Sequence, residues 1–176
     1  MQKEKNGLIL LYTGNGKGKT TAAFGQALRA LGHGMKVCMI QFIKGKWSCG
    51  EEIIAERFSD NFKLCRVGKG FTWESKDLKE DKEMAIQGWR LAVDIIKNGD
   101  YSMLILDELT YLSKFPLVDP QEILDVLKEK PPHLHIIITG RSAPNELINL
   151  ADIVTEMKEI KHPLKCGIYA QKGIEF

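Results

Sequence analysis

Short apolar runs alternate with longer amphipathic stretches along most of the chain. An apolar run of roughly four to eight residues predicts a buried strand, and apolar residues that recur every three or four positions predict a helix. Strands are expected in this way at residues 7–12, 36–43, 62–67, 103–108 and 134–139, with closing strands at 153–160 and 167–170. Helices are expected after residue 21, ending at Gly32, and at about residues 51–58, 76–97, 120–130 and 144–150. This alternation predicts an α/β fold with a mostly parallel sheet and helices on both faces.

Several of these helices carry burial and boundary signals. The first helix should bury one stripe of apolar side chains, formed by Ala23, Phe24, Ala27, Leu28 and Leu31. The longest helix should follow a Ser75 cap and bury a second stripe, formed by Ala85, Trp89, Ala92, Val93 and Ile96. Asp119, Pro120 and Glu122 match a capping box with proline at the first helical position.

Residues 13–21 (TGNGKGKTT) lie between the first strand and the first helix. A strand, a glycine-rich loop, Lys19-Thr20 and a helix follow one another in the order of a phosphate-binding loop. Backbone N–H groups and the helix N-terminus would face the anion, Lys19 would add a positive charge, and the Thr20 hydroxyl would reach Mg²⁺. The alternative is a purely structural turn, which rarely brings Gly-Lys-Thr to this junction with both flanks correct. Thr13 replaces the usual first glycine, so this variant loop is expected to hold phosphates differently from an ordinary NTPase.

Composition limits the possible classes of protein. The 176 residues, with 44% hydrophobic and 27% charged residues, fit a single globular domain spanning residues 1–176. A net charge of +2 is too small to indicate a nucleic acid partner, and no apolar run reaches the roughly 18 residues of a membrane span. The cysteines include no C-x-x-C pair, which favours reduced thiols. We therefore expect a complete, cytoplasmic protein.

Further candidate residues follow other expected strands. In open α/β sheets, ligands bind beyond the carboxyl ends of the strands. Asp107 and Glu108 end an apolar run there, and one such acid typically serves Mg²⁺ on bound phosphates. Ordinary acids at a strand end are the alternative. Arg141 follows another strand and would clamp a phosphate oxygen with its planar guanidinium, although a surface ion pair fits the sequence nearly as well.

The segment Gly70-Phe71-Thr72-Trp73 places two large aromatic residues in a glycine-bounded loop. One interpretation is a loop that packs into its own hydrophobic core. The other is an apolar platform for a large, flat ligand, with Trp47 from the preceding loop on the same wall. None of the four histidines has metal-site spacing, and only His162 is conceivable as a ligand contact.

Taken together, six segments resemble the P-loop type of ATP:corrinoid adenosyltransferase. They are the loop region 13–25 (TGNGKGKTTAAFG), 41–45 (QFIKG), 70–74 (GFTWE), 106–111 (LDELTY), 137–141 (IITGR) and 170–176 (AQKGIEF). The resemblance covers nearly the whole chain, and the combination of motifs is specific. It implies a RecA-like P-loop fold, a homodimer, and transfer of the 5′-deoxyadenosyl group of ATP to the cobalt of a reduced corrinoid, leaving triphosphate. A flavoprotein-type electron donor would reduce the cobalt.

The resemblance also assigns roles to individual residues. It implies that ATP lies reversed in the loop and that Glu108 and Thr20 hold Mg²⁺. Phe71 and Trp73 would pack against the lower face of the corrin ring. The expected nucleotide-binding residues are Gly14, Asn15, Gly16, Lys17, Gly18, Lys19, Thr20, Thr21 and Arg141, and the expected catalytic residues are Lys19, Glu108, Phe71 and Trp73. Some members carry a long N-terminal arm over the corrinoid site, whereas only about six residues precede the first expected strand here.

This chemistry requires few catalytic groups. Cobalt(I) is itself a strong nucleophile, so the protein has to align C5′ with cobalt and stabilise the departing triphosphate. Two other functions remain open from the residues. A RecA-like ATPase or small-molecule kinase would use Glu108 to align water, and a non-catalytic nucleotide switch would bind a partner through the Phe71-Trp73 loop.

Overall fold

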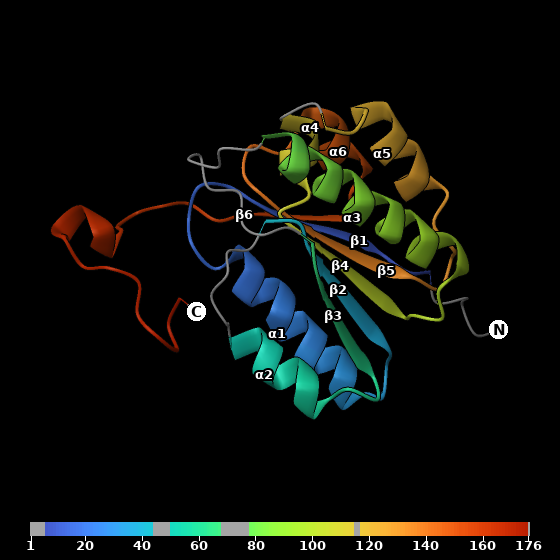
Figure 1. Ribbon diagram of the computed structural model, residues 1–176, viewed down its shortest axis with the longest axis horizontal. Helices are drawn as coiled ribbons and strands as arrows, with labels where there is room; N and C mark the ends of the chain where they lie inside the picture. Colours follow the sequence, from blue (N-terminus) through green and yellow to red (C-terminus); the bar gives the residue numbers. More distant parts are fainter. Residues whose placement is uncertain (1–5, 44–49, 68–77, 115–116, 176) are drawn as a thin grey trace.

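The structure is a computed structural model, which describes residues 6–43, 50–67, 78–114 and 117–175. Its centre is one sheet of six parallel strands in the order β3-β2-β4-β5-β1-β6 (Figure 1). The strands are β1 (Ile9–Thr13), β2 (Val37–Gln41), β3 (Phe62–Arg66), β4 (Met103–Asp107), β5 (His135–Thr139) and β6 (Ile153–Glu156). The predicted parallel α/β architecture is confirmed.

Helices cover both faces of this sheet (Figure 1). On one face lie α1 (Lys19–Gly32) and α2 (Gly50–Arg57). On the other lie α3 (Leu78–Asn98), α4 (Thr110–Lys114), α5 (Pro120–Lys128) and α6 (Asn145–Leu150). None of the described helices is long and apolar enough to cross a membrane.

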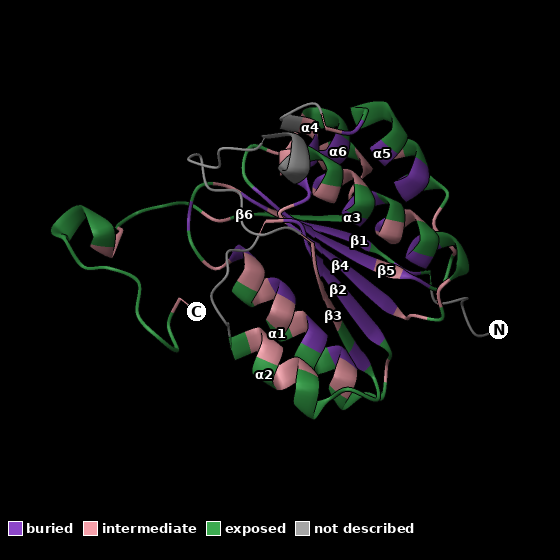
Figure 2. Cartoon of the chain, viewed as in Figure 1, coloured by how far each residue is buried: buried purple, intermediate pink, exposed green. Residues whose placement is uncertain are grey.

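Alternation along the strands divides the hydrophobic core into two layers. Successive side chains of a strand point to opposite faces of a sheet. Leu104 and Leu106 of β4 therefore belong to the larger layer beneath α3, α5 and α6, whereas Met103 and Ile105 belong to the layer beneath α1. The inner strands are buried and the outer strand β6 is exposed along its whole length (Figure 2). This two-sided burial explains why the inner strands read as continuous apolar runs.

Helix α1 packs through small residues. Ala23, Ala27 and Ala30 are its buried apolar side chains, whereas Leu28, expected in the buried stripe, is 41% exposed. Alanines let a helix approach a sheet closely, and this selects the alanine face over the leucine face. Gly32 is the last helical residue, and the left-handed position that follows is Gly34, with φ 72°.

Helices α3 and α5 depart from the sequence expectation at Val93 and Glu122. The predicted stripe of α3 is buried at Ala85, Trp89, Ala92 and Ile96, with Val93 only half-buried; Ser75 lies outside the described residues. Asp119 caps α5 by accepting a hydrogen bond of 2.9 Å from the Gln121 N–H. Glu122 instead accepts a 2.8 Å hydrogen bond from the Trp89 indole, so its carboxylate joins two helices.

The C-terminal segment is where the predicted strands are wrong. β6 ends at Glu156, and residues 167–170 form no strand. A short 3-10 turn at Pro163–Cys166 ends at Gly167, whose φ of 74° is incompatible with an extended strand. The tail lies away from the sheet, largely exposed, and then returns toward the start of α1 (Figures 1 and 2). The strand expected at 153–160 is therefore confirmed only as far as Glu156, and the strand expected at 167–170 is wrong.

Candidate functional site

The phosphate loop is shaped by contact with the segment that follows β6. The Gly16 N–H donates to the Met157 carbonyl at 2.7 Å, and the Met157 N–H donates to the Thr13 carbonyl at 2.8 Å. A Cβ atom on Gly16 would lie 2.8 Å from the Lys158 backbone, and one on Gly14 would overlap the Met157 carbonyl. Packing against residues 157–158 therefore requires glycine at positions 14 and 16, which explains part of the unusual glycine spacing.

Thr13 occupies the place of the usual first glycine and is buried. Its hydroxyl accepts a hydrogen bond of 3.3 Å from the Ala143 N–H, in the loop after β5. The threonine thereby ties the start of the phosphate loop to the neighbouring loop that carries Arg141.

Lys19 is the first residue of α1 and is only 6% exposed. Its ammonium donates to the Gly16 carbonyl at 2.8 Å, within the loop itself. Burial lowers the pKa of Lys19 and the nearby Arg141 lowers it further, whereas the carboxylates of Glu108 and Asp107 raise it. The ammonium is thus positioned at the helix N-terminus, where an anion is favoured.

Asp107 ends β4 and is almost completely buried. Its Oδ1 accepts hydrogen bonds from the hydroxyls of Thr20 at 2.9 Å and Thr139 at 2.7 Å. Its Oδ2 lies 3.4 Å from the Gln41 amide nitrogen. Asp107 is therefore a structural acceptor beneath the loop, and it orients the Thr20 hydroxyl.

Glu108, the second acid, faces the phosphate loop. It has a left-handed backbone, with φ 62°, and its N–H donates to the Thr139 hydroxyl at 2.9 Å. Its Oε2 is buried without a hydrogen-bond partner among the described residues. Burial and the Asp107 charge raise the pKa of Glu108, while Lys19 and Arg141 oppose that rise. A buried carboxylate oxygen of this kind suits a cation brought in with a ligand.

Six of the predicted residues that carry polar side chains line one cleft. They surround a hollow of about 200 Å³ and are Lys17, Lys19, Thr20, Thr21, Glu108 and Arg141. The Arg141 carbonyl accepts a 2.9 Å hydrogen bond from the Thr110 hydroxyl, which fixes the backbone at this position. These six residues bring three cations, one carboxylate and two hydroxyls to the carboxyl edge of the sheet.

Sequence reasoning missed three residues of this cleft. Glu51 of α2 lines it, and the C-terminal tail contributes Ile174 and Glu175. The Glu175 carboxylate lies 2.9 Å from the Lys17 ammonium, and its side chain is 15% exposed. No periodicity could place an irregular tail against the loop, and the only available signal was the resemblance of residues 170–176 to the family.

Four further residues were singled out in the sequence as candidate ligand contacts: Trp47, Phe71, Trp73 and His162. Phe71, Trp73 and Trp47 lie outside the described residues. His162 accepts a hydrogen bond from the Leu164 N–H at 3.2 Å and caps the exposed 3-10 turn. Among the described residues, no group of three or more His, Cys, Asp or Glu side chains is arranged to hold a metal ion.

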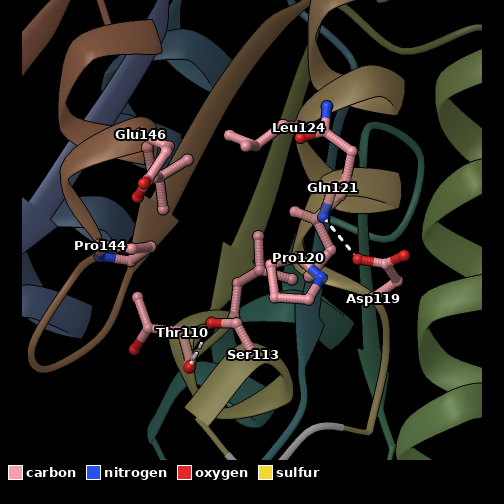
Figure 3. Close-up of a pocket in the computed structure, with 11 residues that line it drawn as sticks. Thr110, Ser113, Asp119, Pro120, Gln121, Leu124, Pro144 and Glu146 are labelled. Carbon is pink, nitrogen blue, oxygen red and sulfur yellow. Dashed lines mark hydrogen bonds between the residues drawn. The ribbon is translucent and has the colours of Figure 1, made fainter.

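A separate apolar pocket of about 280 Å³ lies among α4, α5 and α6 (Figure 3). Leu109, Ile123 and Leu147 contribute apolar walls. The Ser113 hydroxyl at its rim donates to the Thr110 carbonyl at 2.9 Å. Because this hydroxyl is already paired within the protein, the pocket offers fewer polar groups to a ligand than the cleft does.

Comparisons with known proteins agree with this geometry. Residues 5–176 match the model of the ATP:corrinoid adenosyltransferase BtuR/CobO/CobP family. The chain is 44% identical over 175 residues to a corrinoid adenosyltransferase of Sinorhizobium sp., covering 98% of this chain and 82% of that protein. It is 39% identical over 174 residues to the Escherichia coli K12 corrinoid adenosyltransferase, covering 99% of this chain and 88% of that protein.

Solved structures show the same fold at low sequence identity. The flagellar accessory protein FlaH from Methanocaldococcus jannaschii aligns with a TM-score of 0.56 at 10% identity, over 86% of this chain and 71% of that one. A KaiC-like protein from Pyrococcus horikoshii aligns with a TM-score of 0.54 at 15% identity, over 89% and 75%. The RecA-like P-loop fold is thereby confirmed, and with the near-complete match to the family model, this chain belongs to the ATP:corrinoid adenosyltransferase BtuR/CobO/CobP family.

Proposed function

We propose that this chain transfers the 5′-deoxyadenosyl group of ATP to the cobalt of a Co(I) corrinoid and releases triphosphate. The observation that carries the proposal is the cleft that gathers Lys19, Arg141 and Glu108 at the phosphate loop, in a chain that matches this family over residues 5–176. The cleft offers groups that bind a departing polyphosphate. Such an arrangement suits a reaction in which the cobalt of the corrinoid substrate, and not a side chain of the protein, is the nucleophile.

The triphosphate is held by residues 14–21 of the loop, by the Lys19 ammonium and by the Arg141 guanidinium. Lys19 is fixed at the N-terminus of α1, and Arg141 lines the same cleft. Preorganised cations of this kind stabilise negative charge as it develops on a leaving group. In this proposal ATP lies reversed in the loop, so that C5′ faces the corrinoid.

Mg²⁺ fits the oxygen donors at this site. The Thr20 hydroxyl donates a hydrogen bond to Asp107, so the lone pairs of the Thr20 oxygen stay available to a cation. The Glu108 Oε2 is buried and unpaired among the described residues. Thr20 and Glu108 would therefore hold the ion, which would neutralise part of the triphosphate charge.

The transfer itself balances without a protein nucleophile. Cobalt(I) supplies the electron pair of the new Co–C5′ bond and becomes formally cobalt(III). The C5′–O bond breaks, and its electron pair leaves with the triphosphate. The protein aligns C5′ with cobalt and holds the leaving group in place.

The remaining parts of the proposal concern partners. Phe71 and Trp73 pack against the lower face of the corrin ring and exclude its axial base and water. A flavoprotein-type donor supplies the electron that produces cobalt(I). We further propose a homodimer, because the resemblance implies that assembly. We propose a cytoplasmic location because the cysteine pattern favours reduced thiols and no apolar run reaches the length of a membrane span.

The test uses ATP and a chemically reduced corrinoid, followed by the visible spectrum of the cobalt–carbon product. Wild-type protein should form the adenosylated product. Lys19→Ala should weaken ATP binding by roughly ten- to over a hundredfold, because a charge-assisted contact contributes about 1.5–3 kcal/mol. Absence of product with folded wild-type protein would reject the proposal, and wild-type ATP affinity in Lys19→Ala would reject the role of Lys19.

A further inference from the structure

Thr139 is the last residue of β5 and is completely buried between β4 and β1. The three residues before it in β5 are isoleucines, so a hydroxyl at this position stands out. That hydroxyl makes two hydrogen bonds, both to the neighbouring acidic pair. It donates to Asp107 Oδ1 at 2.7 Å, and it accepts from the Glu108 N–H at 2.9 Å.

The direction of these hydrogen bonds is fixed by chemistry. An ionised carboxylate accepts only, so the Thr139 proton points to Asp107 and the Thr139 lone pair faces the Glu108 amide. The Thr20 hydroxyl likewise donates to Asp107, at 2.9 Å. One continuous chain of hydrogen bonds therefore joins the phosphate loop to the backbone of Glu108.

The geometry of Glu108 depends on this chain. In a regular strand, consecutive side chains point to opposite faces, so Asp107 and Glu108 would not both lie beside the phosphate loop. The left-handed backbone of Glu108, with φ 62°, interrupts that alternation. This conformation is uncommon for residues other than glycine and persists where the surroundings hold it in place. The Thr139 hydroxyl contacts this turn directly, by accepting the hydrogen bond of the Glu108 amide.

We propose that Thr139 is a positioning residue, which sets the orientation of both acids and, through Asp107, of the Thr20 hydroxyl. Thr139 does not itself contact substrate, because it is fully buried beneath the cleft. Its role in turnover rests on the proposed function, but its role in Mg²⁺-dependent binding of a polyphosphate can be measured without any corrinoid.

The experiment makes two comparisons at position 139, each between a residue with a hydroxyl and one without: threonine with valine, and serine with alanine. Thr139→Val removes the hydroxyl at nearly constant shape, and Thr139→Ser keeps the hydroxyl without the methyl group. Thr139→Ala, compared with Thr139→Ser, isolates the hydroxyl a second time should the valine variant fail to fold. Ser113→Ala is the control, because its half-buried hydroxyl donates to the Thr110 carbonyl within α4 and bonds neither to the two acids nor to Arg141.

The main readout is calorimetric binding of tripolyphosphate across a Mg²⁺ titration, with the melting temperature measured on each variant. Loss of an outer hydrogen-bonding partner of a metal ligand typically costs 10–100-fold. We expect Thr139→Val and Thr139→Ala to need roughly tenfold or more Mg²⁺ for half-maximal binding, as in the typical range for such a loss. Thr139→Ser should resemble wild type, and Ser113→Ala should leave the Mg²⁺ requirement unchanged.

An unchanged Mg²⁺ requirement in folded Thr139→Val or Thr139→Ala would overturn the inference. Equal shifts in Thr139→Ser and Thr139→Ala would do so as well, because packing and not the hydroxyl would then be responsible. If wild-type protein shows the expected binding but no adenosylation, the proposed function fails while the role of Thr139 stands.

Discussion

The ammonium of Lys17, in the phosphate loop, lies 2.9 Å from the carboxylate of Glu175, in the C-terminal tail. This ion pair joins segments that are far apart in the sequence. It also places a negative charge beside a loop that is built to bind anions. Glu175 therefore competes electrostatically with a polyphosphate for the same surroundings.

Glu175→Gln should tighten tripolyphosphate binding, because it removes a repelling charge and releases Lys17. An ion pair that is partly exposed contributes about 0.2–1 kcal/mol, so we expect an increase in affinity of up to about fivefold. The gain should diminish at high salt. Calorimetry at two salt concentrations measures it.

Asp100→Asn is the control for Glu175→Gln. It removes the same charge from a surface ion pair with Lys36, just before β4 at the opposite end of the strands. Its tripolyphosphate affinity should match that of wild type. Weaker binding by Glu175→Gln would mean that the tail assists the anion, contrary to this interpretation.

Asp107→Ala and Glu108→Gln should separate stability from turnover. The Asp107 Oδ1 accepts from the hydroxyls of Thr20 and Thr139, so alanine leaves these donors without their acceptor and should lower the free energy of unfolding by about 1–3 kcal/mol. Glu108→Gln neutralises a buried, unpaired oxygen and should not destabilise the fold. It should instead slow Mg²⁺-dependent adenosylation. Urea denaturation and a rate series in Mg²⁺ test both statements.

Two outcomes would contradict this assignment. If Glu108→Gln reacts at the wild-type rate with the same Mg²⁺ requirement, Glu108 is not a ligand. If Asp107→Ala is as stable as wild type, the hydrogen bonds of Asp107 to the two threonines do not support the fold.

The alternation of apolar and amphipathic stretches was sufficient to predict the inner strands. Strands such as β2 and β4 are buried on both faces, and this leaves a continuous apolar run in the sequence. The phosphate loop, Asp107-Glu108 and Arg141 were predictable because parallel strands bring their carboxyl ends to one edge. The family and its RecA-like fold were likewise predicted and are confirmed by the comparisons.

Other parts of the site depend on contacts that leave no periodic signal. The tail reaches the loop through Ile174 and Glu175, although its residues form no regular element there. The role of Thr139 follows from the left-handed turn at Glu108, which a strand pattern does not reveal. The assignments of Phe71 and Trp73 to the corrin ring and the reversed direction of ATP stay predictions.

Acid should destabilise the protein through His135. Burial lowers the pKa of His135, the nearby Lys130 lowers it further, and its Nδ1 accepts a 3.1 Å hydrogen bond from the Leu8 N–H. The folded pKa is therefore below the unfolded value of about 6.5. The neutral ring contributes stability above that value, and this contribution is lost as the pH falls through the folded pKa.

Between about pH 8 and about pH 5, the melting temperature of wild type should fall further than that of His135→Asn. Asparagine keeps a hydrogen-bond acceptor but does not titrate. His33→Asn, at an exposed position after α1, should lose as much as wild type. Equal losses in wild type and His135→Asn would remove His135 from the acid response.

Trp73→Ala should damage the reaction from a Co(II) corrinoid far more than the reaction from Co(I). If Phe71 and Trp73 exclude the lower axial ligand, they lower the cobalt orbital that accepts the electron, and this matters only during reduction. A core-packing role predicts a stability loss of about 3–5 kcal/mol, with both reactions falling together. The two assays and the melting temperature, measured on the same variant, distinguish these roles.

The phosphate loop should release intact triphosphate, because cobalt and not water attacks ATP. The identity of the phosphate product, resolved by anion-exchange chromatography with and without Co(I) corrinoid, tests this. We expect triphosphate in equal amount to adenosylated corrinoid, and only when Co(I) corrinoid is present. Rapid formation of ADP and orthophosphate without corrinoid would contradict it and identify the chain as an ATPase.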